Sequence, residues 1–212
     1  MTAAAWAFFG LAAFFAIGDW YAVARRRRVL EYFCKPAATG ALVGVAATLD
    51  AAHGDTRAWF VAALILCLAG DVFLMLPQDR FVAGLGSFLI AHVAFTVGFV
   101  LHGGSTREYA AGAFIVAVAM VPLSSRFVGA LQRSGHTELM APILAYIAAI
   151  GVMVACAIGV SNAWGIAGAV TFMVSDSLIA ETRFVGYRPW GRLAIMVTYH
   201  LALVGLVLSL LP

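Results

Sequence analysis

The stretch AWFVAALILCLAGDVFLML, residues 58–76, decides the fold class of this chain. It is uncharged except for the single carboxylate Asp71, and it has the length of about 20 apolar residues that a helix needs to cross a bilayer. Similar stretches recur along the 212 residues of the chain. Eight membrane-spanning helices are predicted, at residues 3–24, 36–52, 58–76, 81–101, 109–123, 139–159, 164–180 and 193–211.

The composition supports this assignment over the whole chain. Hydrophobic residues make up 64% of it and charged residues 11%, with a mean hydropathy of +0.99. Soluble domains average about 45–50% apolar and about 25% charged residues. A water-soluble enzyme, a disordered chain and a nucleic-acid binder are therefore excluded. We predict an all-α polytopic membrane protein in which residues 1–212 form a single transmembrane domain.

Basic residues are distributed unevenly over the loops between the predicted helices. Of the 13 Lys and Arg residues, all but Arg57 and Arg107 lie at the first, third, fifth and seventh connections. Cytoplasmic loops of membrane proteins are enriched in Lys and Arg. We therefore predict a multi-pass protein of the cell membrane with both termini on the extracytoplasmic side.

Several ionisable residues lie inside the predicted helices, in the half that would face the cytoplasm. They are expensive to place in a membrane, since a central Asp costs at least ~2.5 kcal/mol on insertion scales, and they mark functional sites by default. We expect the carboxyl groups of Asp71 and Asp176 to meet in one small cavity, bordered by His92 or His200. Two neighbouring carboxyl groups can divide the roles of proton donor and proton acceptor between them.

Each of these residues also has an alternative interpretation. The aspartates can form helix-packing hydrogen bonds or ion pairs with nearby arginines, and Asp19, beside Trp20, can extend toward the interface. The sequence also allows a metal site of Asp and His side chains, although no close ligand spacing such as HExxH supports it. Lys35 precedes Pro36 at the predicted start of the second helix. Its ammonium group either binds a lipid phosphate or simply belongs to the Lys and Arg residues that are enriched in cytoplasmic loops.

A faint internal repeat relates the two halves of the chain. Gly70-Asp71 and Ser175-Asp176 are each followed, after one residue, by two large apolar residues, and the next predicted helices carry His92 and His200. This pattern is compatible with a 4+4 parallel repeat, in which the first four helices correspond to the last four.

The order of these motifs resembles the YhhN-type family of integral membrane proteins, whose characterised members are lysoplasmalogenases. The resemblance extends from Lys35 to Ala202, and its last block departs from the family by having Leu203 where a Gln is expected. The motifs that carry it are Lys35-Pro36, GDVFLML at 70–76, Ala91-His92, Tyr146, SDSL at 175–178 and TYHLA at 198–202.

The resemblance implies hydrolysis of the vinyl-ether bond of a lysophospholipid substrate, which gives a fatty aldehyde and a glycerophospho-base. Such a bond is cleaved by protonation at carbon followed by addition of water, so two carboxyl groups suffice, with no metal and no cofactor. The implied site has Asp71, Asp176, His200, Tyr199 and His92 as catalytic candidates and Lys35, Asp19 and Tyr146 as substrate-binding candidates.

Two other functions use the same intramembrane Asp and His cluster. One is a small proton-coupled transporter, and the other is a lipid-binding membrane protein without chemistry. The almost purely apolar outer half of the predicted helices argues against a transport path through the membrane, and the deep acidic pair argues against a purely structural role. Membrane lipids are expected partners in every case, and the sequence leaves the oligomeric state and the natural lysolipid open.

Overall fold

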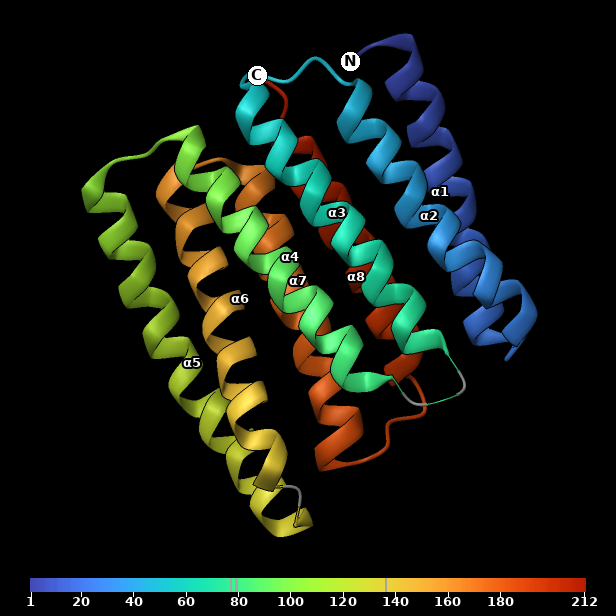
Figure 1. Cartoon of the computed structure of the whole chain (residues 1–212), viewed down its shortest axis with the longest axis vertical. Helices are drawn as coiled ribbons and strands as arrows, with labels where there is room; N and C mark the ends of the chain where they lie inside the picture. The colour runs from blue at the N-terminus through green and yellow to red at the C-terminus, as the bar shows by residue number, and fades with distance from the viewer. Residues whose placement is uncertain (77, 79, 136) are drawn as a thin grey trace.

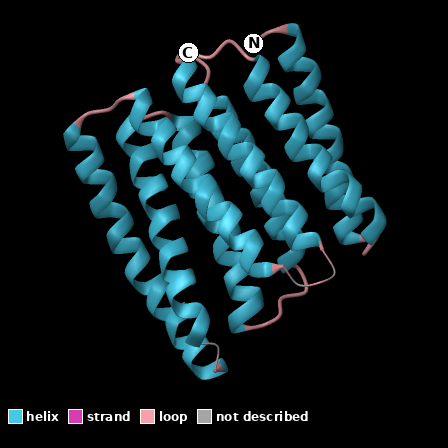
Figure 2. Cartoon of the chain, in the orientation of Figure 1, coloured by secondary structure: helices cyan, strands magenta, loops and turns pink. Residues whose placement is uncertain are grey.

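The computed structural model describes residues 1–76, 78, 80–135 and 137–212, and within this part the chain is helical, without strands (Figures 1 and 2). A 3₁₀ turn (Thr137–Leu139) precedes α6 (Met140–Val160), and a π-helical turn, η2 (Glu181–Val185), follows α7 (Ala163–Ala180). The elements are α1 (Ala3–Ala24), α2 (Arg28–Thr48), α3 (Gly54–Met75), α4 (Phe81–His102), α5 (Thr106–Ser134), η1 (Thr137–Leu139), α6 (Met140–Val160), α7 (Ala163–Ala180), η2 (Glu181–Val185) and α8 (Gly191–Leu208).

Seven of these helices are long and apolar enough to cross a membrane. The prediction of an all-α, multi-pass membrane protein is therefore confirmed. The remaining long helix, α2, begins at Arg28 rather than at Pro36, and its first two turns carry Glu31 and Lys35. Pro36 consequently lies inside α2 and not in its first turn, where it leaves the carbonyl four residues earlier without its usual helical donor.

The fifth helix is also longer than the sequence predicted. It extends from Thr106 to Ser134, whereas apolar residues alone indicated 109–123. A capping box fixes its start, because Ser105 and Glu108 each bond to the other's backbone amide. Polar residues continue the helix beyond Pro122 until Gly135 ends it in a left-handed conformation.

Consecutive helices pack as antiparallel pairs, with α5 and α1 at opposite edges of the bundle (Figure 1). The loops that follow α1, α3, α5 and α7 lie at one end, which we call the basic end because Arg25, Arg80, Arg133 and Arg188 lie there or beside it. Both termini lie at the opposite end (Figure 1). The aspartates, the histidines and the lysine discussed below are carried by helices that cross between these two ends.

The centre of the bundle is aromatic and closely packed. Phe60, Phe95 and Phe172 are almost completely buried there. Helices α7 and α8 approach each other through Gly168 and Gly205, where a Cβ atom on Gly205 would lie 2.8 Å from the Cα of Gly168. Small residues at such contacts let membrane helices approach closely.

The helix contacts repeat between the two halves. α4 packs against α6, and α8 packs against α2, which are equivalent pairs if α1–α4 corresponds to α5–α8. The pairs α2–α3 and α6–α7 are equivalent in the same way, and both occur. These two correspondences are compatible with a parallel 4+4 repeat, but the contacts of α8 with α1 and α3 lack equally strong counterparts of α4 with α5 and α7 among the described residues, and the duplication itself stays a prediction.

Candidate functional site

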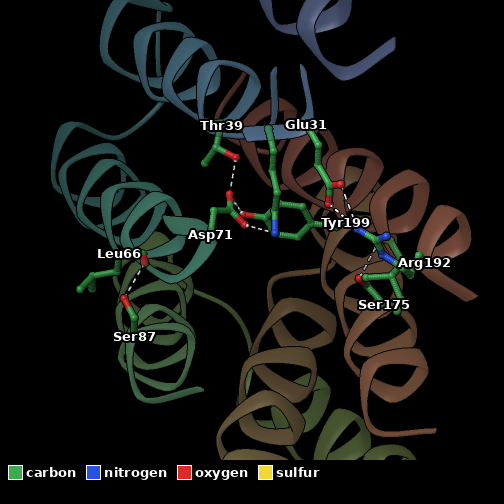
Figure 3. Close-up of polar contacts among 10 residues, drawn as sticks. Glu31, Thr39, Leu66, Asp71, Ser87, Ser175, Arg192 and Tyr199 are labelled. Carbon is green, nitrogen blue, oxygen red and sulfur yellow. Dashed lines mark hydrogen bonds and ion pairs between the residues drawn. The ribbon is translucent and has the colours of Figure 1, made fainter. Parts of the chain in front are cut away.

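Asp71 is the centre of a buried polar cluster between α2, α3 and α8. Its Oδ1 lies 3.2 Å from the Nζ of Lys35, and its Oδ2 accepts hydrogen bonds of 2.7 Å each from the Thr39 and Tyr199 hydroxyls (Figure 3). Lys35 and Thr39 are four residues apart and therefore share one face of α2. Asp71 has no exposed surface, so its charge is compensated by a cation and two donors rather than by water.

Asp176 lies in a different environment between α4, α6 and α7. Its Oδ2 accepts a hydrogen bond of 2.5 Å from the Tyr146 hydroxyl and lies 3.7 Å from the Nε2 of His92. The ring of His92 is fully buried, with its edge or face against Tyr146 and Phe172. Two aromatic side chains thus hold the carboxyl group of Asp176, and no Lys or Arg is among the partners that the described residues give it.

One aromatic side chain touches the surroundings of both carboxyl groups. The ring of Phe172 contacts both His92, on the side of Asp176, and Tyr199, on the side of Asp71. The immediate partners of the two carboxyl groups therefore differ, and the expectation that the two aspartates meet in one cavity stays a prediction. The sequence predicted their common depth in the membrane, but the side chains of other helices decide what each one faces.

Asp176 lines an apolar, partly open cavity of about 60 Å³. Asp176 is the sole carboxylate among its described lining residues, and Tyr146 accompanies it. We call this space the apolar cavity. The other residues that define it are Leu74, Phe81, Leu85, Phe88, Met120, Leu123, Phe127, Ile143, Ile147, Ile150, Met173, Ser177, Ile179, Ala180 and Phe184.

A second, polar space of about 470 Å³ opens at the basic end and is called here the basic cavity. It shares Leu74, Phe81 and Ile179 with the apolar cavity, so the two spaces are neighbours on either side of these residues. The remaining residues that define it are Arg28, Glu31, Tyr32, Lys35, Met75, Leu76, Thr182, Arg183, Arg192, Ile195 and Met196.

Two ion pairs organise the basic cavity. One Nη of Arg192 lies 2.8 and 2.9 Å from the two carboxylate oxygens of Glu31, which ties α8 to the first turn of α2 (Figure 3). Lys35 borders the cavity and also pairs with Asp71 inside the bundle. Lys35 therefore connects the buried cluster to the space at the basic end.

Two of the predicted site residues have no hydrogen bond to either aspartate, although both lie within electrostatic range of Lys35. His200 accepts a hydrogen bond from Trp20, on α1, rather than contacting either aspartate. Asp19 is fully buried, and neither of its oxygens has a hydrogen-bond partner among the described residues. The interpretation of Asp19 as a side chain that reaches the interface is therefore wrong.

Within the described part of the chain, no group of three or more His, Cys, Asp and Glu side chains converges as metal ligands would. Asp71 and Asp176 are held by separate partners, and His92 and His200 lie on different helices with different contacts. The arrangement instead presents one carboxyl group to an apolar space and several cations to a neighbouring polar one. Such a pair of spaces fits an amphiphile with a single chain and an anionic head.

Sequence reasoning missed four residues of this region. Thr39 lies one helical turn after Lys35, and that spacing is a signal that was available. Trp20 was noted beside Asp19 as an interfacial aromatic, without its bond to His200. Glu31 and Arg192 are 161 positions apart, so their pairing has no local signal in the sequence.

Comparisons with known proteins give one family and several relatives. The sequence model of the YhhN family matches residues 30–210. A protein of Mycobacterium bovis and one of Mycobacterium tuberculosis, each named lysoplasmalogenase, are 34% identical to the chain over 158 residues. That alignment covers 71% of the chain and 60% of the length of these relatives.

A more distant relative comes from Sus scrofa. It is named lysoplasmalogenase TMEM86B and is 30% identical over 160 residues, which cover 74% of the chain and 66% of that relative. No solved structure gives a significant match.

Proposed function

Because the chain belongs to the YhhN family, we propose that it is a membrane-embedded hydrolase that cleaves the vinyl-ether bond of a lysoplasmalogen. The names of its relatives support the reaction class. The single observation that carries the proposal is that Asp176, backed by Tyr146, lines an apolar cavity next to a cavity rich in Arg and Lys.

The substrate is placed by matching its parts to the two cavities. Its single chain occupies the apolar cavity, and its phosphate lies in the basic cavity near Arg28, Lys35 and Arg192. Guanidinium groups bind phosphate through charge-assisted hydrogen bonds. The bond between chain and glycerol then falls near the residues common to both cavities, Leu74, Phe81 and Ile179.

Asp176 is the proposed catalytic acid. In its protonated form it transfers the proton to the vinyl carbon that is not bonded to oxygen, and the neighbouring carbon becomes an oxocarbenium ion. The carboxylate left on Asp176 stabilises this cation and takes a proton from the attacking water, which restores the acid. The resulting hemiacetal breaks down to the fatty aldehyde and the free glycerol hydroxyl, so that one water is consumed.

The neighbours of Asp176 and Asp71 act through position. The Tyr146 hydroxyl, 2.5 Å from Oδ2 of Asp176, fixes the carboxyl group, and His92 packs behind it. Asp71 is fully buried against Lys35 and Tyr199, so we assign it to holding the ammonium group of Lys35 at the border of the basic cavity. One carboxyl group thus serves the chemistry, and the other serves the binding of the head group.

The proposal includes an orientation. With the basic end in the cytoplasm, as the excess of Arg there favours, the termini lie outside the cell membrane and the lysolipid enters from the cytoplasmic leaflet.

The test is product analysis on the purified, detergent-solubilised protein. Incubation with a choline lysoplasmalogen should release a fatty aldehyde that mass spectrometry detects, and incubation with the matching acyl lysophospholipid should release no fatty acid. Asp176→Asn should abolish the release, whereas Asp55→Asn, at the exposed start of α3, should not. Release of fatty acid alone, or full activity of Asp176→Asn, would refute the proposal.

A further inference from the structure

The hydrogen bond between Trp20 and His200 fixes which ring nitrogen of His200 carries a proton. The indole Nε1 donates to Nδ1 of His200 at 3.0 Å and also approaches the Met196 carbonyl oxygen at 3.3 Å. An indole N–H is a donor only, so Nδ1 must accept and cannot carry a proton. The imidazole of His200 is therefore neutral, with its proton on Nε2.

That proton has no acceptor within the described part of the chain. His200 is 2% exposed, and its Nε2 is buried without a hydrogen-bond partner. A buried donor without a partner is unfavourable, and such groups in native proteins call for an explanation. The side chain thus carries one N–H that the described residues leave unpaired and that neighbouring side chains cover, so a ligand reaches it only when those side chains shift.

His200 lines a third space, called here the lateral cavity, between α1, α2 and α8. This space has a volume of about 230 Å³, and apolar side chains such as Phe9, Leu42 and Val204 surround it. Ile17 and Leu201 also line it and are 60% and 52% exposed, so it opens to the side of the bundle that lipid covers. It shares no lining residue with the apolar or the basic cavity.

We propose that the lateral cavity binds a single-chain lipid whose end group is a carbonyl, with the carbonyl oxygen accepting the Nε2–H of His200. The lining of the cavity along α1 extends from Phe9 to Trp20, which at about 1.5 Å per residue is about 16 Å and accommodates much of an acyl chain. Trp20 and His200 mark the polar end of this length, which lies toward the basic end.

The chemistry of the site selects a carbonyl among possible end groups. A carbonyl brings an acceptor and no donor, so the one N–H of His200 satisfies it. A carboxylate would bring a charge into an apolar space with a single neutral donor, which is costly. The fatty aldehyde is the carbonyl lipid that the reaction proposed above releases, and this identification of the occupant rests on that proposed function.

The experiment uses protein labelled with ¹⁵N in its five histidines, in nanodiscs of phosphatidylcholine. The His200 signals are identified by their loss in His200→Phe. The nitrogen spectrum should show His200 as the Nε2–H tautomer. Its Nε2 signal should shift on addition of 2-tridecanone, an unreactive stand-in for the aldehyde, and should not shift with tridecane. A proton on Nδ1, or equal responses to the two compounds, would overturn the proposal.

Two further variants separate the cavity from the hydrogen bond. Ala13→Phe narrows the lateral cavity from its exposed side, so the tautomer should persist while the response to 2-tridecanone is lost. Trp20→Phe removes the donor that fixes the tautomer, so the His200 signals should change before any ligand is added.

The last compound added is dodecanoate. If dodecanoate shifts the Nε2 signal of His200 more than 2-tridecanone does, the aldehyde is excluded as the occupant. Because the readout is binding, it stands or falls independently of whether the protein hydrolyses a lysoplasmalogen.

Discussion

Substituting Asp71 with Asn should destabilise the protein, whereas the same substitution at Asp176 should not. The Nζ of Lys35 lies 3.2 Å from Oδ1 of Asp71. At that distance and an effective dielectric constant of about 20, the attraction between two unit charges is about 5 kcal/mol. Removing one partner of a buried ion pair typically costs about 3–5 kcal/mol, because the other charge is left without compensation.

The position of Lys35 sets the expected value within this range. Its side chain is 6% exposed but borders the basic cavity, so water there can recover part of the loss. We therefore expect the free energy of unfolding to fall by about 3 kcal/mol in Asp71→Asn. The partners of Asp176 are a phenol and an imidazole 3.7 Å away, so Asp176→Asn leaves no cation unpaired and should change stability by less than about 1 kcal/mol.

The assay is reversible unfolding in mixed micelles of increasing dodecyl sulfate content, followed by circular dichroism. A double-mutant cycle with Lys35→Met isolates the pair. The double variant should be more stable than Asp71→Asn, since it removes both charges together. The role of Asp71 as the partner that compensates the charge of Lys35 is refuted by either of two results. One is that Asp71→Asn unfolds at the same dodecyl sulfate fraction as the parent, and the other is that the double variant is no more stable than Asp71→Asn.

The remaining predictions concern the reaction and the topology. Asp176→Asn should lower the rate of aldehyde release by about 10²–10⁴-fold, the usual contribution of a general acid or base, and a chelator should leave the parent's rate unchanged if no metal takes part. Ile150→Trp fills part of the apolar cavity that Asp176 lines and should raise KM for long-chain substrates more than for short-chain ones, as initial rates would show. In a variant without the native cysteines, Ala4→Cys in intact cells should react with an impermeant thiol reagent. Labelling of Ala4→Cys only after lysis would reverse the proposed orientation.

The sequence alone predicted the class of the fold, because apolar runs of spanning length have few alternatives in a membrane protein. It placed the start of α2 at Pro36, because charged residues such as Arg28, Glu31 and Lys35 are not expected inside a membrane-spanning helix when their partners are unknown. In the structure Glu31 pairs with Arg192, and Lys35 pairs with Asp71, so the helix extends over these residues. The partners come from α8 and α3, and no local pattern indicates them.

The difference between the two aspartates also lay beyond the sequence. Their local contexts are alike, a small residue before the Asp and two large apolar residues shortly after it, and both lie near the ends of their helices. What separates them is the neighbouring helix. α2 presents Lys35 and Thr39 to Asp71, whereas α6 presents Tyr146 to Asp176. Roles that depend on facing side chains follow from tertiary packing.

This contrast gives the proposed 4+4 repeat a functional meaning. In a duplicated scaffold the two acidic positions begin as equivalents. Each lies between the preceding helix of its own half and the last helix of the other half. Asp71 accordingly bonds to Tyr199 of α8, and Asp176 approaches His92 of α4. A cation opposite one of them makes that carboxylate a fixed part of a binding site. A phenol opposite the other, in an apolar cavity, leaves that carboxyl group without a paired cation, so under the proposed function one ancestral pair would supply both head-group binding and acid catalysis.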